Sequence, residues 1–273
     1  MRKPCAKASL VLGKSQPLDK PAPLPDGLAS IVGVFFTAFI LFLLSSYYPN
    51  PVEGYTYAFG VFTAVCAIYF FDHYLDFMTI FGGLNSYTRL NKILAVIFSI
   101  ITVLIVLLFW PTYLLNLNYW FGVVGVLIYV LLYLIKKPTF RFLKEVAIAA
   151  TAAWVVCIKP DTAPNYFAVV ALAVLFFQNV ILYSFMEKEL DEYFGFRSAF
   201  NAALYSSKKT TLIKLQMVAF VAVGIAVYFN GLPNGIGFVS LAYVLLVFFV
   251  EKDAVKKHYR FLFDALLLGM FIP

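Results

Sequence analysis

Two pairs of acidic residues are the side chains in this sequence best suited to chemistry. Asp72 and Asp76 are four residues apart and come where the uncharged run 54–71 ends. Glu187 and Asp191 repeat that spacing at the end of another apolar run. Residues four apart on a helix lie one turn apart on the same face, so each pair would present two carboxylates together.

Carboxylates in this arrangement are typical ligands of hard divalent cations. Magnesium takes oxygen ligands, keeps several waters, and usually binds through one or two carboxylates plus the phosphates of a substrate. Two such pairs on facing helix ends would suit a pair of ions that bridge a diphosphate. Carboxylates this close to hydrocarbon are unfavourable unless they are paired, bound to metal or placed in a wet cavity. The alternative is a set of solvated loop charges, which is the interpretation favoured for Glu189 and Glu192.

The composition indicates a multi-span membrane protein. Of the 273 residues, 63% are hydrophobic and 13% are charged, and the mean hydropathy is +0.88, whereas soluble domains are about 45–50% apolar and about 25% charged. Three distant cysteines and two histidines have no spacing typical of a disulfide framework, a zinc site or a His-rich metal site. The net charge of +7 could suggest nucleic-acid binding, but the basic residues lie between apolar segments and therefore indicate membrane topology.

The apolar segments predict an all-α, polytopic membrane helix bundle with nine transmembrane helices. A spanning helix needs about 20 mostly apolar residues, and every span must be helical because lipid offers no partner to free backbone groups. Residues 1–26 are expected to form a polar, Pro-rich leader, and residues 27–273 a single transmembrane domain. The expected spans are 27–47, 55–76, 92–110, 118–135, 143–158, 165–186, 212–229, 234–250 and 259–273.

The basic residues predict a cytoplasmic N-terminus. With nine spans in that orientation, all 21 Lys and Arg residues except Lys159 fall on the cytoplasmic side, as the positive-inside rule requires. Both acidic pairs lie on the same side, after the second and the sixth span. We therefore expect a multi-pass protein of the cell membrane whose site faces the cytoplasm.

In topology and in the order of their motifs, residues 27–273 resemble the UbiA superfamily of intramembrane prenyltransferases. They resemble a divergent branch of that superfamily more than its quinone-making enzymes. That family has nine helices, a cytoplasmic N-terminus, and Asp-rich motifs after helices two and six. Its first motif reads NDxxDxxxD, often with Arg after the middle Asp. Asp72 and Asp76 match the last two acids, whereas Ile68-Tyr69 stands at the Asn-Asp and His73 at the Arg.

The remaining family motifs are also similar to stretches of this chain. The second motif, DxxxD, is met by Glu187 and Asp191, and Gly195 and Ser198 follow as a Gly and a small hydroxyl residue often do in the family. A Tyr-x-x-Lys-Arg-like element after helix four is matched by Tyr133-Leu134-Ile135-Lys136-Lys137.

The resemblance implies a transferase of alkyl groups other than methyl. It would move a prenyl group from a prenyl diphosphate to an aromatic or other lipophilic acceptor, among membrane lipids. Mg²⁺ would neutralise the diphosphate as it leaves, and lysines would add positive charge to the phosphates. The implied catalytic residues and metal ligands are Asp72, Asp76, Glu187 and Asp191, and the implied diphosphate-binding residues are Lys136, Lys137 and His73.

Two other functions stay open at this point. A UbiA-type terpene cyclase would ionise a prenyl diphosphate and quench the cation internally, so its product would form without any acceptor. A transporter or non-catalytic membrane protein is the other alternative. Transporters usually place charged or broken-helix sites near the bilayer midplane, often in repeated halves, and neither feature is visible here.

Four further polar residues have simpler expected roles. His73 is as readily an interfacial histidine as a diphosphate ligand or a base. Asn179 is expected to make a helix–helix hydrogen bond. Asp264 is expected to pair with Arg260, one turn away on the same helix, and Glu145 to be a first-turn acid favoured by the helix dipole.

Overall fold

The protein, seen in a computed structural model, is a bundle of α-helices. No strand occurs among the residues that the structure describes, which confirms the all-α class expected from the apolar segments. The described residues are 27–47, 51–81, 86–109, 120–121, 124–125, 127–128, 131, 141–157, 165–188 and 208–271.

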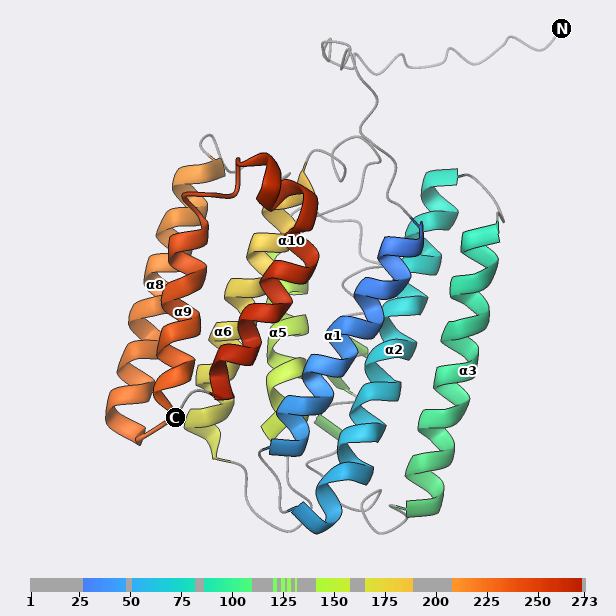
Figure 1. Ribbon diagram of the computed structural model, residues 1–273. Helices are drawn as coiled ribbons and strands as arrows, with labels where there is room; N and C mark the ends of the chain where they lie inside the picture. Colours follow the sequence, from blue (N-terminus) through green and yellow to red (C-terminus); the bar gives the residue numbers. More distant parts are fainter. Residues whose placement is uncertain are drawn as a thin grey trace, which may run out of the picture.

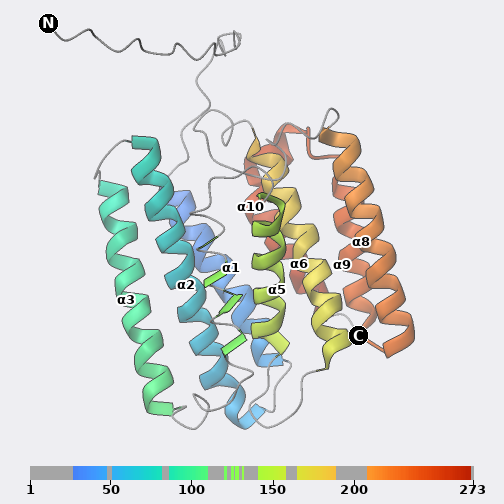
Figure 2. The ribbon, with the colours of Figure 1, turned by 180° about the vertical axis from the view of Figure 1, so that it is seen from behind.

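The helices stand side by side along one common direction (Figure 1). Helices α1, α2 and α3 form one end of the row and α8 and α9 the other, with α5, α6 and α10 between them, and the view from behind keeps this order (Figure 2). Their bounds are α1 Gly27–Tyr47, α2 Pro51–Phe81, α3 Ser86–Phe109, α5 Arg141–Cys157, α6 Tyr166–Met186, α8 Lys208–Asn230, α9 Asn234–Leu246, α10 Asp253–Leu266 and the 3₁₀ helix η3 Leu267–Phe271.

The chain runs back and forth along the bundle, so several helix ends meet at the same level. We call the level at which α1 begins and α2 ends the upper end of the bundle (Figure 1). Helix α6 also ends there, and α3, α5, α8 and α10 begin there. Asp72 and Asp76 therefore belong to a helix, α2, that ends at this level, and Glu187 caps a second one, α6, that also ends there.

Most expected spans match observed helices, although several helices extend beyond the expected bounds, and α3 begins at Ser86, six residues before the expected span 92–110. The expected span 118–135 lies largely outside the described residues. Helix α1 coincides with its expected range, and α6 differs from it by one residue. Helix α2 continues to Phe81, because nothing in its last turns breaks a helix, so Asp72 lies well inside the helix rather than at its end. Helix α10 begins at Asp253, six residues before the expected span, because its first turns are polar and an apolar criterion misses them.

The described helices carry the length and apolarity of membrane spans. Four are long and apolar enough to cross a bilayer, and three shorter helices are also apolar: Tyr55–Leu75, Ser86–Phe109, Tyr166–Met186 and Lys209–Asn230, then Ile31–Ser46, Glu145–Cys157 and Asn234–Leu246. The outer face of α3 exposes large aliphatic side chains, among them Leu108 at 71% and Val103 at 55%. A water-soluble surface rarely carries so continuous an apolar face, whereas a lipid-facing helix requires one.

Two apolar clusters hold the bundle together. One joins α1, α2 and α3 through Val34, Phe70 and Ala95, with Phe35 packed edge-on against Phe70. The larger cluster joins α1, α2, α5, α6, α8, α9, α10 and η3, and its fully buried members include the side chains of Leu172, Leu182, Tyr243 and Phe263. Helix α10 is thus part of the core, although its first turns are polar.

A buried amide network connects α6, α8 and α9 half-way along the bundle. Gln178 Nε2 donates to the carbonyls of Gln216 and Ser240, and its Oε1 accepts from Ser240 Oγ at 2.6 Å. In return, Gln216 Nε2 donates to the carbonyl of Gln178 at 2.8 Å. Polar side chains at this depth are stable only when they bond one another across helices, so the network sets the register of three helices.

Replacing Gln178 with leucine is expected to lower the free energy of unfolding by about 1–2 kcal/mol, because Ser240 Oγ loses a buried acceptor. Detergent-driven unfolding of the purified protein measures this change. The control is Val170→Ala on the same helix, where the side chain is 58% exposed and the expected change is below about 0.5 kcal/mol. Equal stability of both variants would show that the network contributes nothing.

Gly125 allows the helical residues around it to approach α5 closely. A Cβ atom at this position would lie 2.3 Å from Thr151 Oγ1 and 3.3 Å from its Cβ. Gly125→Ala should therefore cost about 1–3 kcal/mol through overpacking, and adding Thr151→Ala should recover most of the loss. Gly224→Ala, where nothing lies within 4 Å, should stabilise its helix by about 0.5–1 kcal/mol. Thermal unfolding of these three variants and the wild type tests this pattern, and a Gly125→Ala variant as stable as wild type would contradict it.

Candidate functional site

The α2 side of the upper end presents Tyr69, Asp72 and His73. His73 Nδ1 lies 2.8 Å from the carbonyl oxygen of Tyr69, and a carbonyl only accepts, so Nδ1 carries the proton and Nε2 offers its lone pair when the ring is neutral. His73 also interacts electrostatically with Asp72 beside it and with Glu187 of α6. Asp72 of α2 and Glu187 of α6 therefore act on one shared region.

On the α6 side, Glu187 forms the clearest ion pair of that region. Glu187 caps the end of α6, where a negative charge meets the negative end of the helix dipole and needs a cation. Arg260 of α10 supplies that cation, with Nη2 2.8 Å from Glu187 Oε1. The hydroxyl of Tyr259 donates to the same oxygen at 2.7 Å, and Arg260 Nε donates to the Tyr259 hydroxyl at 3.2 Å.

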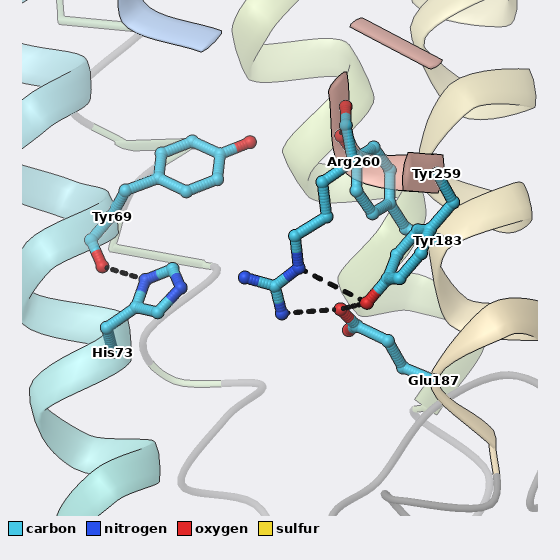
Figure 3. A network of polar contacts seen from close by, with 6 residues as sticks. All are labelled: Tyr69, His73, Tyr183, Glu187, Tyr259 and Arg260. Atoms are coloured by element: carbon cyan, nitrogen blue, oxygen red, sulfur yellow. Dashed lines mark hydrogen bonds and ion pairs between the residues drawn. The ribbon is translucent and has the colours of Figure 1, made fainter. Parts of the chain in front are cut away.

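Figure 3 shows the guanidinium of Arg260 between the two sides of this region, with Glu187 and Tyr259 on one side and Tyr69 and His73 on the other. Among the described residues, Oε1 of Glu187 accepts both hydrogen bonds while Oε2 accepts none. Within the described part of the chain, protein groups thus hold one carboxylate oxygen of Glu187 and not the other.

One turn deeper along α10, Asp264 forms a second, buried polar group. Its carboxylate is 3% exposed and accepts hydrogen bonds from Thr37 Oγ1 of α1 and from Asn179 Nδ2 of α6, the latter at 3.0 Å. Tyr183 donates to the carbonyl of Arg260 at 2.6 Å. These bonds join α1, α6 and α10 directly beneath the ion pair.

The predicted site residues are described only in part. Asp72, His73 and Glu187 lie in the shared region at the upper end. The side chain of Asp76 and the whole of Lys136, Lys137 and Asp191 lie outside the described residues. Within the described part, no three His, Cys, Asp or Glu side chains form a group that could hold a metal ion; two of the four expected ligands are not among them.

Three residues of this region were not predicted as site residues. Arg260 and Asp264 were expected to pair with each other. The ion-pair partner that the structure shows for Arg260 is instead Glu187, and Asp264 accepts hydrogen bonds from Thr37 and Asn179. Tyr259 had no signal in the sequence beyond its position next to Arg260. The expected helix–helix hydrogen bond of Asn179 is confirmed.

Glu145 also differs from its expected role. It lies in the second turn of α5 and is 2% exposed, so it is a buried residue rather than a solvated first-turn acid. Its Oε1 accepts a hydrogen bond from Ser184 Oγ of α6 at 3.0 Å. The contact joins α5 to α6 one turn below Glu187.

Comparison of the chain with protein-family models, with curated proteins and with solved structures gives no match. The chemistry of the site is therefore inferred from its own side chains.

Proposed function

We propose that the protein is a magnesium-dependent intramembrane prenyltransferase, which moves a prenyl group from a prenyl diphosphate to an aromatic or other lipophilic acceptor. The observation that carries the proposal is the shared region at the upper end, where Glu187 of α6 and His73 of α2, the neighbour of Asp72, lie on opposite sides of the Arg260 guanidinium (Figure 3). The resemblance of the acidic motifs to the UbiA superfamily supports the same reaction.

The donor set at this end suits magnesium. Asp72 and Glu187 offer hard carboxylate oxygens, and Oε2 of Glu187 accepts no hydrogen bond from the described residues. In the proposed site, Asp72, Asp76, Glu187 and Asp191 hold the ion, which binds through a few carboxylates and the substrate's phosphates rather than in an all-protein cage. Bound magnesium would supply charge neutralisation of the departing diphosphate.

In the proposed reaction the allylic C–O bond of the prenyl diphosphate breaks, and the diphosphate leaves with the electron pair. The allylic carbon then bonds to the acceptor, which releases a proton. Lys136 and Lys137 would stabilise the negative charge of the leaving group. His73, whose neutral ring is protonated on Nδ1, would accept a proton at Nε2, and the imidazolium so formed would donate a hydrogen bond to a phosphate oxygen.

The proposed topology places the site at the cytoplasmic surface of the cell membrane. Nine spans with a cytoplasmic N-terminus put nearly all basic residues on one side. The alternation of the described helices supports this arrangement, because α2 and α6 end at the upper level where α1 begins (Figure 1). Residues 1–26 would then precede a single transmembrane domain, on its cytoplasmic side.

The test is an assay of the purified full-length protein in lipid nanodiscs with magnesium and radiolabelled prenyl diphosphates of several chain lengths. We expect release of diphosphate that requires magnesium and stops when a chelator is added. A product that forms without any added acceptor would identify a cyclase instead. Neither release nor binding of any prenyl diphosphate at any chain length would remove the proposal.

A further inference from the structure

Among the described side chains at this site, Arg260 has the most hydrogen-bond donors left for an anion. A guanidinium has five N–H donors, and the contacts of Arg260 with the described residues use two of them, one on Nη2 and one on Nε. Both donors of Nη1 are left, and Figure 3 shows that nitrogen directed away from Glu187, toward His73. The side chain is 28% exposed, so a ligand can reach it.

The guanidinium is also held firmly in place. Glu187 and Tyr259 fix its position from one side. The backbone of α10 is held by two tyrosines: the half-buried Tyr183 donates to the carbonyl of Arg260 at 2.6 Å, and the buried Tyr243 donates to that of Phe263 at 2.9 Å. A guanidinium held in place in this way loses little conformational entropy when it binds a phosphate.

We propose that Arg260 is a diphosphate-binding residue of the site, with Nη1 as the donor to a phosphate oxygen. This inference rests on the proposed function, because it takes a magnesium diphosphate as the ligand. It also gives the two oxygens of Glu187 separate roles: Oε1 positions the guanidinium, and Oε2 faces the cation. Arg260 comes from the last described α-helix, which carries none of the expected motifs.

The surrounding charges predict that the anion and the cation bind together. Asp72, Glu187, Asp264 and Arg260 all act electrostatically on Tyr69, so the described part of this region holds three carboxylates for one guanidinium and offers a free diphosphate no excess positive charge. Bound magnesium adds positive charge to this region. The charge-assisted hydrogen bond of Arg260 can then add to the affinity for the diphosphate. Without magnesium, the contribution of Arg260 should be small.

Calorimetric titration of the full-length protein with pyrophosphate, and with a farnesyl thiodiphosphate that cannot ionise, tests the proposal in the presence and absence of magnesium. With magnesium, Arg260→Gln should weaken binding of both probes by about 10-fold to 100-fold. Lys256→Gln removes the same charge from an exposed position on the same helix and should change the affinity by less than about 2-fold. Magnesium alone should bind Arg260→Gln at least as tightly as wild type, because Glu187 loses its competing cation.

The outcomes separate this inference from the proposed function. If the wild type binds neither probe, the proposed function fails and this inference fails with it. If the wild type binds and Arg260→Gln binds equally well, only this inference is overturned. Should Arg260→Gln not fold, Arg260→Lys keeps the charge but cannot serve Glu187 and a phosphate at once; it should bind several-fold more weakly than wild type, and wild-type affinity would overturn the proposal.

Discussion

Asp72→Asn is expected to lower the rate of magnesium-dependent diphosphate release by about 100-fold to 1,000-fold. The substitution keeps the size and shape of the side chain and removes its charge, so it weakens magnesium binding without opening a cavity. The half-buried carboxylate of Asp72 stands beside His73, within electrostatic range of Tyr69. Release of radiolabelled diphosphate at saturating substrate measures the effect.

The matched control is Asp253→Asn. Asp253 is an exposed acid in the first turn of α10, also at the upper end of the bundle. Its replacement removes one negative charge from the same level without touching the shared region, so activity should stay within about 2-fold. If both variants keep wild-type activity, Asp72 is a solvated surface acid and the magnesium site must be sought elsewhere.

Asp264→Ala should destabilise the protein by about 2–4 kcal/mol. The substitution removes the acceptor of Asn179 Nδ2, and Asn179 is 7% exposed with an Oδ1 that already has no hydrogen-bond partner among the described residues. A buried amide without any partner costs about 1–3 kcal/mol, and the lost packing of α10 against α1 adds to this. Detergent-driven unfolding measures the free energy of unfolding.

The double variant Asn179→Asp, Asp264→Asn tests the same contact between α6 and α10. It keeps one carboxylate and one amide in contact between α6 and α10 while reversing their positions. The double variant should therefore recover most of the stability that either single change removes, which a double-mutant cycle reports directly. Additive losses would mean that the carboxylate is needed at position 264 for another reason, such as its hydrogen bond from Thr37.

The sequence by itself determined the helical class and the bounds of several helices. A run of about 20 apolar residues has one stable solution in lipid, a helix, and α1 and α6 therefore have their expected ranges. Helices α2 and α6, which carry Asp72 and the capping Glu187, both end at the upper level. Asn179 was predictable for a similar reason, because an amide amid apolar residues must find a partner on another helix.

Only the tertiary structure decided which charges meet. Spacing along one helix favours a pair between Arg260 and Asp264, but spacing says nothing about the acid that a neighbouring helix brings closer. Packing of α10 against α1 and α6 places Glu187 at the guanidinium and leaves Asp264 to Thr37 and Asn179. Periodicity reports the face a residue occupies on its own helix, whereas the choice of partner depends on distances across helices, which are set by how the large core side chains fit together.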